Sequence, residues 1–338
     1  RHGAAVEALR TAWAREGVES TTFTEIAGEP TPAMIDAALA AAQSAHCDAV
    51  VAIGGGSVLD AGKAVAGLLP NGGPVTDYLE GVGTGRRLQY APVPYVAVPT
   101  TSGTGAEVTK NAVITSYAPA YKKSFRDERL LARLVLVDPM MTVSLSPAQT
   151  AASGMDALTQ LIEAYVTRKH NPITDGMALE GIRLVAGALV CACTQGDHVQ
   201  ARTDMAAASL LSGLCLANAG LGAVHGIAAA LGAHLGVGHG LACAMLLPHV
   251  MRVNLPACSA RYAQVAQALC GREQAEAGVA FVETLACRIG IARDLRGLHL
   301  STAQIACIAR DSVGSSMNGN PLQQDTAAWM EFLQTIAV

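Results

Sequence analysis

The sequence predicts an α/β fold with two parts, a doubly wound parallel-sheet domain followed by an all-helical domain. In the first part, short apolar runs alternate with helix-like segments, which is typical of a parallel sheet built from strand–helix–strand units. From Ser146 onward the sequence consists of long apolar helical segments with almost no β-branched runs. We therefore place the two domains at residues 1–145 and 146–338.

The predicted elements of the first domain follow from local signals. Thr31 is a suitable N-cap and Pro32 suits the first helical position, so a helix is expected over 32–45. A helix is also expected over 4–15, and another over 58–69. Short apolar runs predict buried strands at 49–53, 94–99 and 134–138. Ser146 and Pro147 form the same N-cap and N1 pair and predict the first helix of the second domain.

Composition excludes several classes of function. The 338 residues include 23 basic and 27 acidic side chains, with a net charge of −4 and no Lys/Arg block. This argues against nucleic-acid binding and against a polybasic membrane patch. At 51% hydrophobic and 15% charged residues, the chain is expected to be globular. No uninterrupted apolar run approaches the roughly 18 residues of a membrane span, so no membrane partner is expected.

The nine cysteines predict a reducing compartment. Most occur singly in apolar stretches, and no C-x-x-C pattern is present. We therefore expect core thiols in a cytoplasmic protein, and neither disulfides nor zinc ligands. The residues of this kind are Cys47, Cys215, Cys243, Cys270, Cys287 and Cys307.

A glycine-rich turn follows the first predicted strand. The run Gly54, Gly55, Gly56 and Ser57 separates that strand from a helix. Glycines let the backbone approach a ligand closely, and the N–H groups of a helix N-terminus favour an anion such as a pyrophosphate. The alternative is a tight turn that only needs positive φ angles. Neither G-x-G-x-x-G nor the Walker A pattern is present.

A second polar loop follows the strand predicted at 94–99. Residues 100–104 supply hydroxyls and small side chains. Such a loop can simply satisfy its own backbone. However, two polar loops at the carboxyl ends of neighbouring parallel strands lie at the edge where open α/β sheets bind ligands.

The helical domain contains a candidate metal site. Asp156 and Gln160 are four residues apart on a predicted helix and share one face. His225 and His239 would lie roughly 21 Å apart on one unbroken helix, but the glycines between them predict a break near Ala233 and a new helix after Gly238. A carboxylate with imidazoles suits Fe(II) or Zn(II). The alternative is a capping or paired Asp156 beside histidines in an apolar core.

These residues resemble a known family. The chain is similar to the iron-containing (group III) alcohol dehydrogenases over essentially its whole length. The resemblance rests on GGGSVLDAGK (54–63), PTTSGTGAEVT (99–109), residues 154–167, residues 223–249 and NGNP (318–321). It implies a Rossmann-like NAD(P)-binding domain, a helical metal and substrate domain, and the architecture shared with dehydroquinate synthase.

The resemblance also implies functional residues. For the pyrophosphate of NAD or NADP, these are Gly55, Gly56 and Ser57. For the rest of the cofactor, they are Asp60, Thr100, Thr101, Asn111 and Lys122. For Fe(II), or for Zn(II) or another divalent ion, they are Asp156, Gln160, His225 and His239. The implied reaction is hydride transfer between the nicotinamide and a small alcohol or aldehyde, with the metal as Lewis acid and with no catalytic residue beyond the metal site.

Three departures from the family pattern affect these expectations. Gln160 stands where the family usually has a histidine, and an amide oxygen is a weaker donor to a transition metal, so metal affinity is expected to be reduced. Ala229 stands where many members have another histidine, and His234 could replace that group only if the chain bends favourably. The first strands of the family's nucleotide-binding domain are also expected to be missing in front of residue 1.

Two alternative functions stay open at this point. The first is a metal-independent reductase on the same scaffold, similar to maleylacetate reductase, which is motivated by Gln160 and Ala229. The second is a non-catalytic homologue, against which Asp156, His225 and His239 argue. By resemblance to the family, a homodimer is expected.

Overall fold

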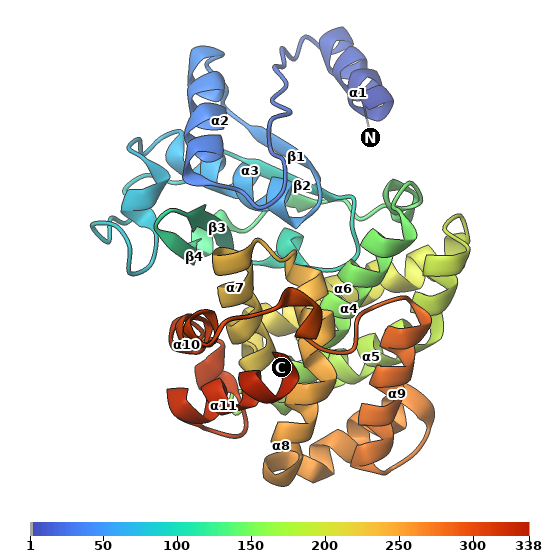
Figure 1. The fold of residues 1–338 in the computed structure, drawn as a ribbon. Helices are drawn as coiled ribbons and strands as arrows, with labels where there is room; N and C mark the ends of the chain where they lie inside the picture. Colours follow the sequence, from blue (N-terminus) through green and yellow to red (C-terminus); the bar gives the residue numbers. More distant parts are fainter. Residues whose placement is uncertain (1–2, 338) are drawn as a thin grey trace.

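The computed structural model describes residues 3–337, which form a sheet region and a larger helical region (Figure 1). The sheet region contains a parallel sheet with helices packed on it, and residues from Ser146 onward are helical. This confirms the predicted fold class. The first helix, α1 (Gly3–Arg15), has no buried residue and is joined to the sheet region by an extended segment.

The parallel sheet consists of β1 (Val50–Gly54), β2 (Tyr95–Pro99) and β5 (Leu134–Val135), in the order β1-β2-β5. The first two strands match the prediction closely. The third is shorter than predicted, because only Leu134 and Val135 pair with β2, and Asp138 then caps a 3₁₀ helix (Pro139–Thr142) with its side chain.

Helices α2 (Pro32–Ser44) and α3 (Gly56–Leu68) pack against each other beside this sheet. Thr31 caps α2 by accepting a hydrogen bond from Met34 N, as its position predicts. Close packing of α3 on the sheet needs a glycine, because a methyl group at Gly62 would lie 2.7 Å from Ala52 Cβ. The carboxyl ends of β1 and β2 are thereby fixed relative to the N-terminus of α3.

An antiparallel hairpin of β3 (Asn111–Tyr117) and β4 (Ala120–Arg126) was not predicted. Charged side chains dominate β4, and the strand lacks the apolar run that marks a buried strand. The hairpin packs on α3 through β3 and on α7 through β4, so it lies between the sheet and the helical region (Figure 1).

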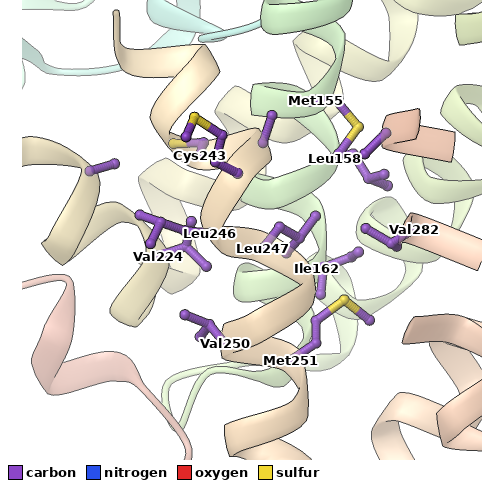
Figure 2. Packing of buried hydrophobic residues seen from close by; sticks show 14 of the residues in the cluster. Met155, Leu158, Ile162, Val224, Cys243, Leu246, Leu247, Val250, Met251 and Val282 are labelled. Atoms are coloured by element: carbon purple, nitrogen blue, oxygen red, sulfur yellow. The ribbon is translucent and has the colours of Figure 1, made fainter. Parts of the chain in front are cut away.

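The helical region begins at α4 (Pro147–Val166), where Ser146 is the N-cap and Pro147 the first helical residue, as predicted. The remaining helices are α5 (Pro172–Thr194), α6 (Val199–Ala219), α7 (Ala223–Leu235), α8 (His239–Cys270), α9 (Ala275–Arg288), α10 (Thr302–Asp311) and α11 (Thr326–Ala337). Their shared core lies around α4 and α8, where Leu158, Ile162, Leu247 and Met251 interdigitate (Figure 2).

Within residues 3–337, two helices, α5 and α8, are long and apolar enough to cross a membrane by length and composition alone, and the bent pair of α6 and α7 would be a third if it counted as one span. In this structure α5 packs against α4 and α6, and α8 packs against α4 and α9. Both therefore contribute to the core of the helical region.

All nine cysteines are free, as the sequence predicts. The prediction that most are core thiols is wrong, because only Cys193, Cys215 and Cys243 are buried. Cys47, Cys191, Cys258 and Cys307 are half-buried, and Cys270 and Cys287 are exposed. One of the buried three, Cys243, does not lie among purely apolar neighbours.

Candidate functional site

The glycine turn joins β1 to α3, and its glycines are required by close packing. Methyl groups at Gly55 and Gly56 would lie 3.1 Å from Thr101 Cγ2 and 2.7 Å from Thr104 Oγ1. Gly55 is the N-cap with φ −74°, and none of residues 54–56 has a positive φ. The alternative of a turn that needs positive φ is therefore wrong. No side chain caps this helix N-terminus, so its first N–H groups lack the partners that a cap would give.

The loop after β2 lies directly against the glycine turn. Thr100 N donates to Gly54 O at 2.9 Å, which continues the sheet contact beyond the strands. Thr100 and Ser102 are buried, and Ser102 Oγ has no hydrogen-bond partner among residues 3–337. The two polar loops are thus neighbours at one sheet edge, as their positions after parallel strands predict.

Asp60 and Lys63 form a buried ion pair on α3, with 3.0 Å between Oδ1 and Nζ. Asp60 Oδ2 also accepts from Val113 N, and Lys63 Nζ donates to Thr109 Oγ1 at 2.9 Å and to Asn111 O at 2.7 Å. Burial raises the pKa of Asp60 more than Lys63 lowers it. The pair links α3 to the hairpin, so the carboxylate predicted for the cofactor already has partners within the sheet region.

The hairpin carries the other two predicted cofactor residues. Asn111 is the first residue of β3, and its backbone oxygen accepts from Lys63. Lys122 on β4 forms an ion pair with Glu29 at 2.9 Å. The hairpin packs on α7, the helix of His225. Burial, followed by the charge of Lys122, lowers the pKa of His239.

The loop after β2 connects the glycine turn to the helical region. A methyl group at Gly103 would lie 2.8 Å from Ser153 Cβ, and Ser153 is one turn before Asp156 on α4. Ser212 on α6 contacts both sides, with its Oγ 3.3 Å from Gly103 O and 3.0 Å from Gln160 Oε1. These contacts bring the predicted cofactor loop and the predicted metal helix together.

Three helices bring together the predicted ligands Asp156, His225 and His239. Helix α7 ends at Leu235 with Gly236 in a left-handed conformation, and α8 begins at His239, so the predicted break between the histidines is confirmed. A methyl group at Gly240 would lie 2.5 Å from Ala152 O, which shows how closely α8 approaches α4. His239 is thereby placed beside Asp156.

The donor atoms of these residues converge on one point. Asp156 Oδ1 lies 3.4 Å from His225 Nε2 and 3.8 Å from His239 Nε2. Cys243 Sγ lies 3.9 Å and 3.8 Å from the same two nitrogens. All four donors are within 4.8 Å of one another. Cys243 was not predicted as a member of this group. It follows His239 by four residues, which places the two side chains on one face of the helix.

Gln160 lies one turn after Asp156 on α4 and is buried, as its spacing predicts. Its Oε1 accepts a hydrogen bond from Ser212 Oγ. His234 lies at the exposed end of α7 and pairs with Asp311 at 2.7 Å, so the structure gives it a partner on α10. Ala229 is on the same helix as His225.

Glu163 fixes the orientation of His225. Its Oε2 lies 2.6 Å from His225 Nδ1, and its Oε1 accepts from Val224 N at 2.7 Å. A proton at Nδ1 donated to this carboxylate leaves the Nε2 lone pair directed at Asp156 and Cys243. Glu163 was not predicted as part of the site. Asp156, Gln160 and Glu163 are four and three residues apart on a buried helix, and this polar stripe is a signal that could have identified it.

Asn320, from the NGNP segment, holds the N-terminus of α7. Its Oδ1 accepts from Ala223 N at 3.2 Å, and its amide exchanges hydrogen bonds with Asn254 at 2.9 and 2.8 Å. Asn320 is fully buried. This segment therefore positions His225 from outside the site.

Burial and mutual contact shift the pKa values of all four side chains in the cluster. Burial would raise the pKa of Asp156, but the nearby His239 and His225 hold it below its usual value. Burial lowers the pKa of His239 to about 4 and raises that of the Cys243 thiol to about 11. For His225 burial acts in the lowering direction, and contacts with Cys243, Asp156 and Glu163 outweigh it, so its pKa is raised.

The residues present fit a divalent metal ion. Asp156 is buried, and its Oδ1 has no hydrogen-bond partner among residues 3–337 although it faces two imidazole nitrogens. An unpartnered buried polar atom costs about 1–3 kcal/mol. A cation at this point would be bound by that oxygen, and carboxylate with imidazole is a donor set for Fe(II) and Zn(II).

Comparisons with known proteins identify the family of the chain. Residues 2–139 match the family model described as iron-containing alcohol dehydrogenase, and residues 150–336 match that of the C-terminal part of the Fe-containing alcohol dehydrogenase family. Long-chain-alcohol dehydrogenase 1 of Geobacillus thermodenitrificans is 38% identical, over 88% of this chain and 77% of that protein.

Solved structures give the same result. The crystal structure of a 1,3-propanediol oxidoreductase superposes with a TM-score of 0.91 and 33% identity, covering 99% of this chain and 88% of that one. The sulfoacetaldehyde reductase of Bifidobacterium kashiwanohense, solved in complex with NAD⁺, superposes with a TM-score of 0.90 and 31% identity, with the same coverage of the two chains.

Proposed function

Since the chain belongs to the iron-containing alcohol dehydrogenase family and is an alcohol dehydrogenase, we propose that Asp156, His225 and His239 hold the metal ion of its reaction. The reaction is hydride transfer between a nicotinamide dinucleotide and a small alcohol or aldehyde. The convergence of an unpartnered buried carboxylate oxygen with two imidazole Nε2 atoms carries the proposal. Gln160 and Cys243 are the candidates for a fourth donor.

The chain's own residues prepare this site. Glu163 accepts the Nδ1 proton of His225 and so directs Nε2 toward Asp156, where a metal ion would take the place of the Nε2 proton. When bound, the metal supplies Lewis-acid polarisation of the substrate oxygen and the dinucleotide supplies the hydride chemistry. Burial of Asp156 and His225 excludes water from the donor atoms.

For the cofactor, we propose that Gly55, Gly56 and Ser57 bind the pyrophosphate of NAD or NADP at the uncapped N-terminus of α3. The hydroxyl loop beside them would contact the rest of the dinucleotide through Thr100 and Thr101. The remaining proposed contacts are Asp60, Asn111 and Lys122. Asp60 and Lys122 must then keep or exchange their ion-pair partners Lys63 and Glu29 when the cofactor binds.

The test of the metal centre is the variant H225A. It should lose metal and turnover, because it removes one imidazole and leaves Glu163 without its partner, while NADH or NADPH affinity stays nearly unchanged. Elemental analysis, turnover and a cofactor-fluorescence titration measure the three quantities. H234A is the matched control, since His234 lies on the same helix but pairs with Asp311. Turnover retained by H225A would contradict the metal role.

Gln160 favours one second candidate function, a metal-independent reductase. Exhaustive chelation separates the two, because turnover unchanged in metal-free protein would support this alternative. Reconstitution with Fe(II) or Zn(II) should restore turnover if the proposed centre is correct.

We also propose the division into domains at 1–145 and 146–338, a homodimer, and a cytoplasmic location. The two family models meet between residues 139 and 150, which supports the division. The exposed helix α1 supports self-association, and nine free cysteines support a reducing compartment. Light scattering of the intact chain tests the dimer.

A further inference from the structure

We propose that Cys243, as a thiolate, is the fourth ligand of the metal ion. It takes the role that the sequence pattern assigns to Gln160. The inference rests on the metal centre proposed above and concerns its fourth donor. It makes the donor set one carboxylate, two imidazoles and one thiolate.

The distances between donor atoms carry the proposal. A tetrahedral ion with bonds of about 2.0 Å to nitrogen and 2.3 Å to sulfur separates those atoms by roughly 3.6 Å. Cys243 Sγ lies 3.9 Å from His225 Nε2 and 3.8 Å from His239 Nε2. The same ion separates nitrogen from oxygen by roughly 3.3 Å, and Asp156 Oδ1 lies 3.4 and 3.8 Å from the two nitrogens. These four separations exceed those of a tetrahedral ion by at most ~0.5 Å, and all four donor atoms lie within 4.8 Å of one another.

The backbone fixes Cys243 in this place. It lies one turn after His239 at the start of α8, so both side chains project from one face. Close contact at Gly240 holds this turn against α4 beside Asp156. Figure 2 shows Cys243 at the end of the core, beyond Leu246 on the same helix. Its position is therefore set by helix packing and does not depend on a mobile loop.

Gln160 is engaged elsewhere. Its Oε1 accepts from Ser212 Oγ at 3.0 Å, and Ser212 Oγ also lies 3.3 Å from Gly103 O and 2.8 Å from Ser209 O. The amide therefore ties α4 to α6 and to the loop after β2. Its oxygen is also a weaker donor than a thiolate to a transition metal.

The alternative to a metal ligand is that Cys243 is a core thiol that only hydrogen-bonds to the histidines. Cys215 provides the contrast, because it is equally buried and donates to a backbone oxygen, Thr174 O, at 3.5 Å. The neighbours of Cys243 are instead the donor nitrogens of two proposed ligands. A thiolate in the set shifts selectivity toward Zn(II) and Co(II) and away from harder ions such as Mg²⁺.

The experiment loads metal-free protein with Co(II) and records bound metal by elemental analysis and the absorption spectrum. Wild type should bind Co(II) and show a sulfur-to-cobalt charge-transfer band in the near-ultraviolet. C243A and C243S should lose this band, and C215A and Q160A should keep it. Affinity for Co(II) should fall at least ~100-fold in C243A, beyond the range for loss of an outer-shell partner, and less than ~10-fold in Q160A.

The outcomes separate the two proposals. Co(II) bound by wild type without the band would overturn Cys243 as a ligand and leave the metal centre standing. Failure of wild type to bind Co(II), Zn(II) or Fe(II) would overturn the metal centre itself. A band that persists in C243S, or that disappears in C215A, would also contradict the assignment. Far-ultraviolet circular dichroism confirms that each variant is folded.

Discussion

The glycine turn and the metal centre are built in opposite ways. The turn uses consecutive residues, and its glycines fit tightly against Thr101 and Thr104 of the neighbouring loop. The metal centre takes its residues from three helices, and its central oxygen, on Asp156, has no hydrogen-bond partner in the described chain. The first region offers a ligand its uncapped helix N–H groups, whereas the second offers a buried carboxylate oxygen beside two imidazole nitrogens.

The buried carboxyls show the same difference. In the sheet region, burial raises the pKa of Asp60 and of Glu107, so the protein environment there disfavours their charge. In the helical region the pKa of Asp156 is lowered despite burial, because His239 and His225 face it. The two regions thus treat a buried carboxyl in opposite ways, because only Asp156 faces imidazoles that outweigh its burial.

The largest expected effect is on the unfolding free energy of the sheet region, in the variant K63M. The variant leaves Asp60 as a buried charge without its cation, which costs about 3–5 kcal/mol of unfolding free energy. Urea unfolding measures the loss. K110M is the control, because Lys110 pairs with the exposed Glu128 and such pairs contribute about 0–1 kcal/mol.

The double variant K63M/D60N sharpens this prediction. Removing both charges should recover much of the lost stability, since replacing both partners of a buried pair is often nearly neutral. If K63M unfolds at the same urea concentration as wild type, the ion pair is not what holds α3 to the hairpin.

The next largest effect is expected on metal affinity, in the variant E163Q. An amide at this position keeps the volume but weakens the bond that orients His225, so metal affinity should fall roughly 10–100-fold. Competition with a chromogenic chelator measures the affinity, and the cofactor titration should not change. E180Q is the control, because Glu180 lies at an exposed position of α5. Equal metal affinity in E163Q and wild type would remove Glu163 from the support of the site.

A smaller effect is expected at the glycine turn, through G56A. The added methyl would lie 2.7 Å from Thr104 Oγ1, and overpacking of this kind costs about 1–3 kcal/mol. Affinity for NADH or NADPH should fall about tenfold or more, with metal content unchanged. G187A is the control, because nothing lies within 4 Å of a methyl at Gly187. Metal loss in G56A would contradict the independence of the two regions.

Most of the fold was predictable because its signals are local. The N-cap residues Thr31 and Ser146 and the break before His239 act within one helical turn, and the structure confirms each. The hairpin of β3 and β4 was missed because β4 lacks an apolar run, although Ala112 and Ile114 alternate on the buried face of β3. How the hairpin packs on α3 and α7 depends on contacts between distant segments, which the sequence pattern does not show.

The metal site was predictable only in part, for the same reason. Asp156, His225 and His239 were predicted from residue type, and the structure places them together. Cys243 was assigned to the core because a single cysteine in an apolar helix usually lies there. Its true neighbours depend on how α8 approaches α4, which is decided at Gly240.

The smallest expected effect is a pH dependence from Glu107 in the sheet region. Its side chain is buried, and burial raises its pKa above the ordinary 4.5. The folded state therefore holds this proton more tightly than the unfolded state, so the contribution to stability is complete below the unfolded pKa and is lost as pH rises through the folded pKa. A difference of one pKa unit corresponds to about 1.4 kcal/mol.

E107Q removes this dependence, because the amide stays neutral at every pH. The difference in unfolding free energy between E107Q and wild type should therefore grow in favour of E107Q as pH rises from 4.5 toward neutrality, and urea midpoints across that range measure it. E331Q, at an exposed position of α11, should show no such trend. Parallel curves for E107Q and wild type would mean that Glu107 ionises freely in the fold. The sheet region would then tolerate buried charge as the metal centre does, and the contrast between the two regions would rest on packing alone.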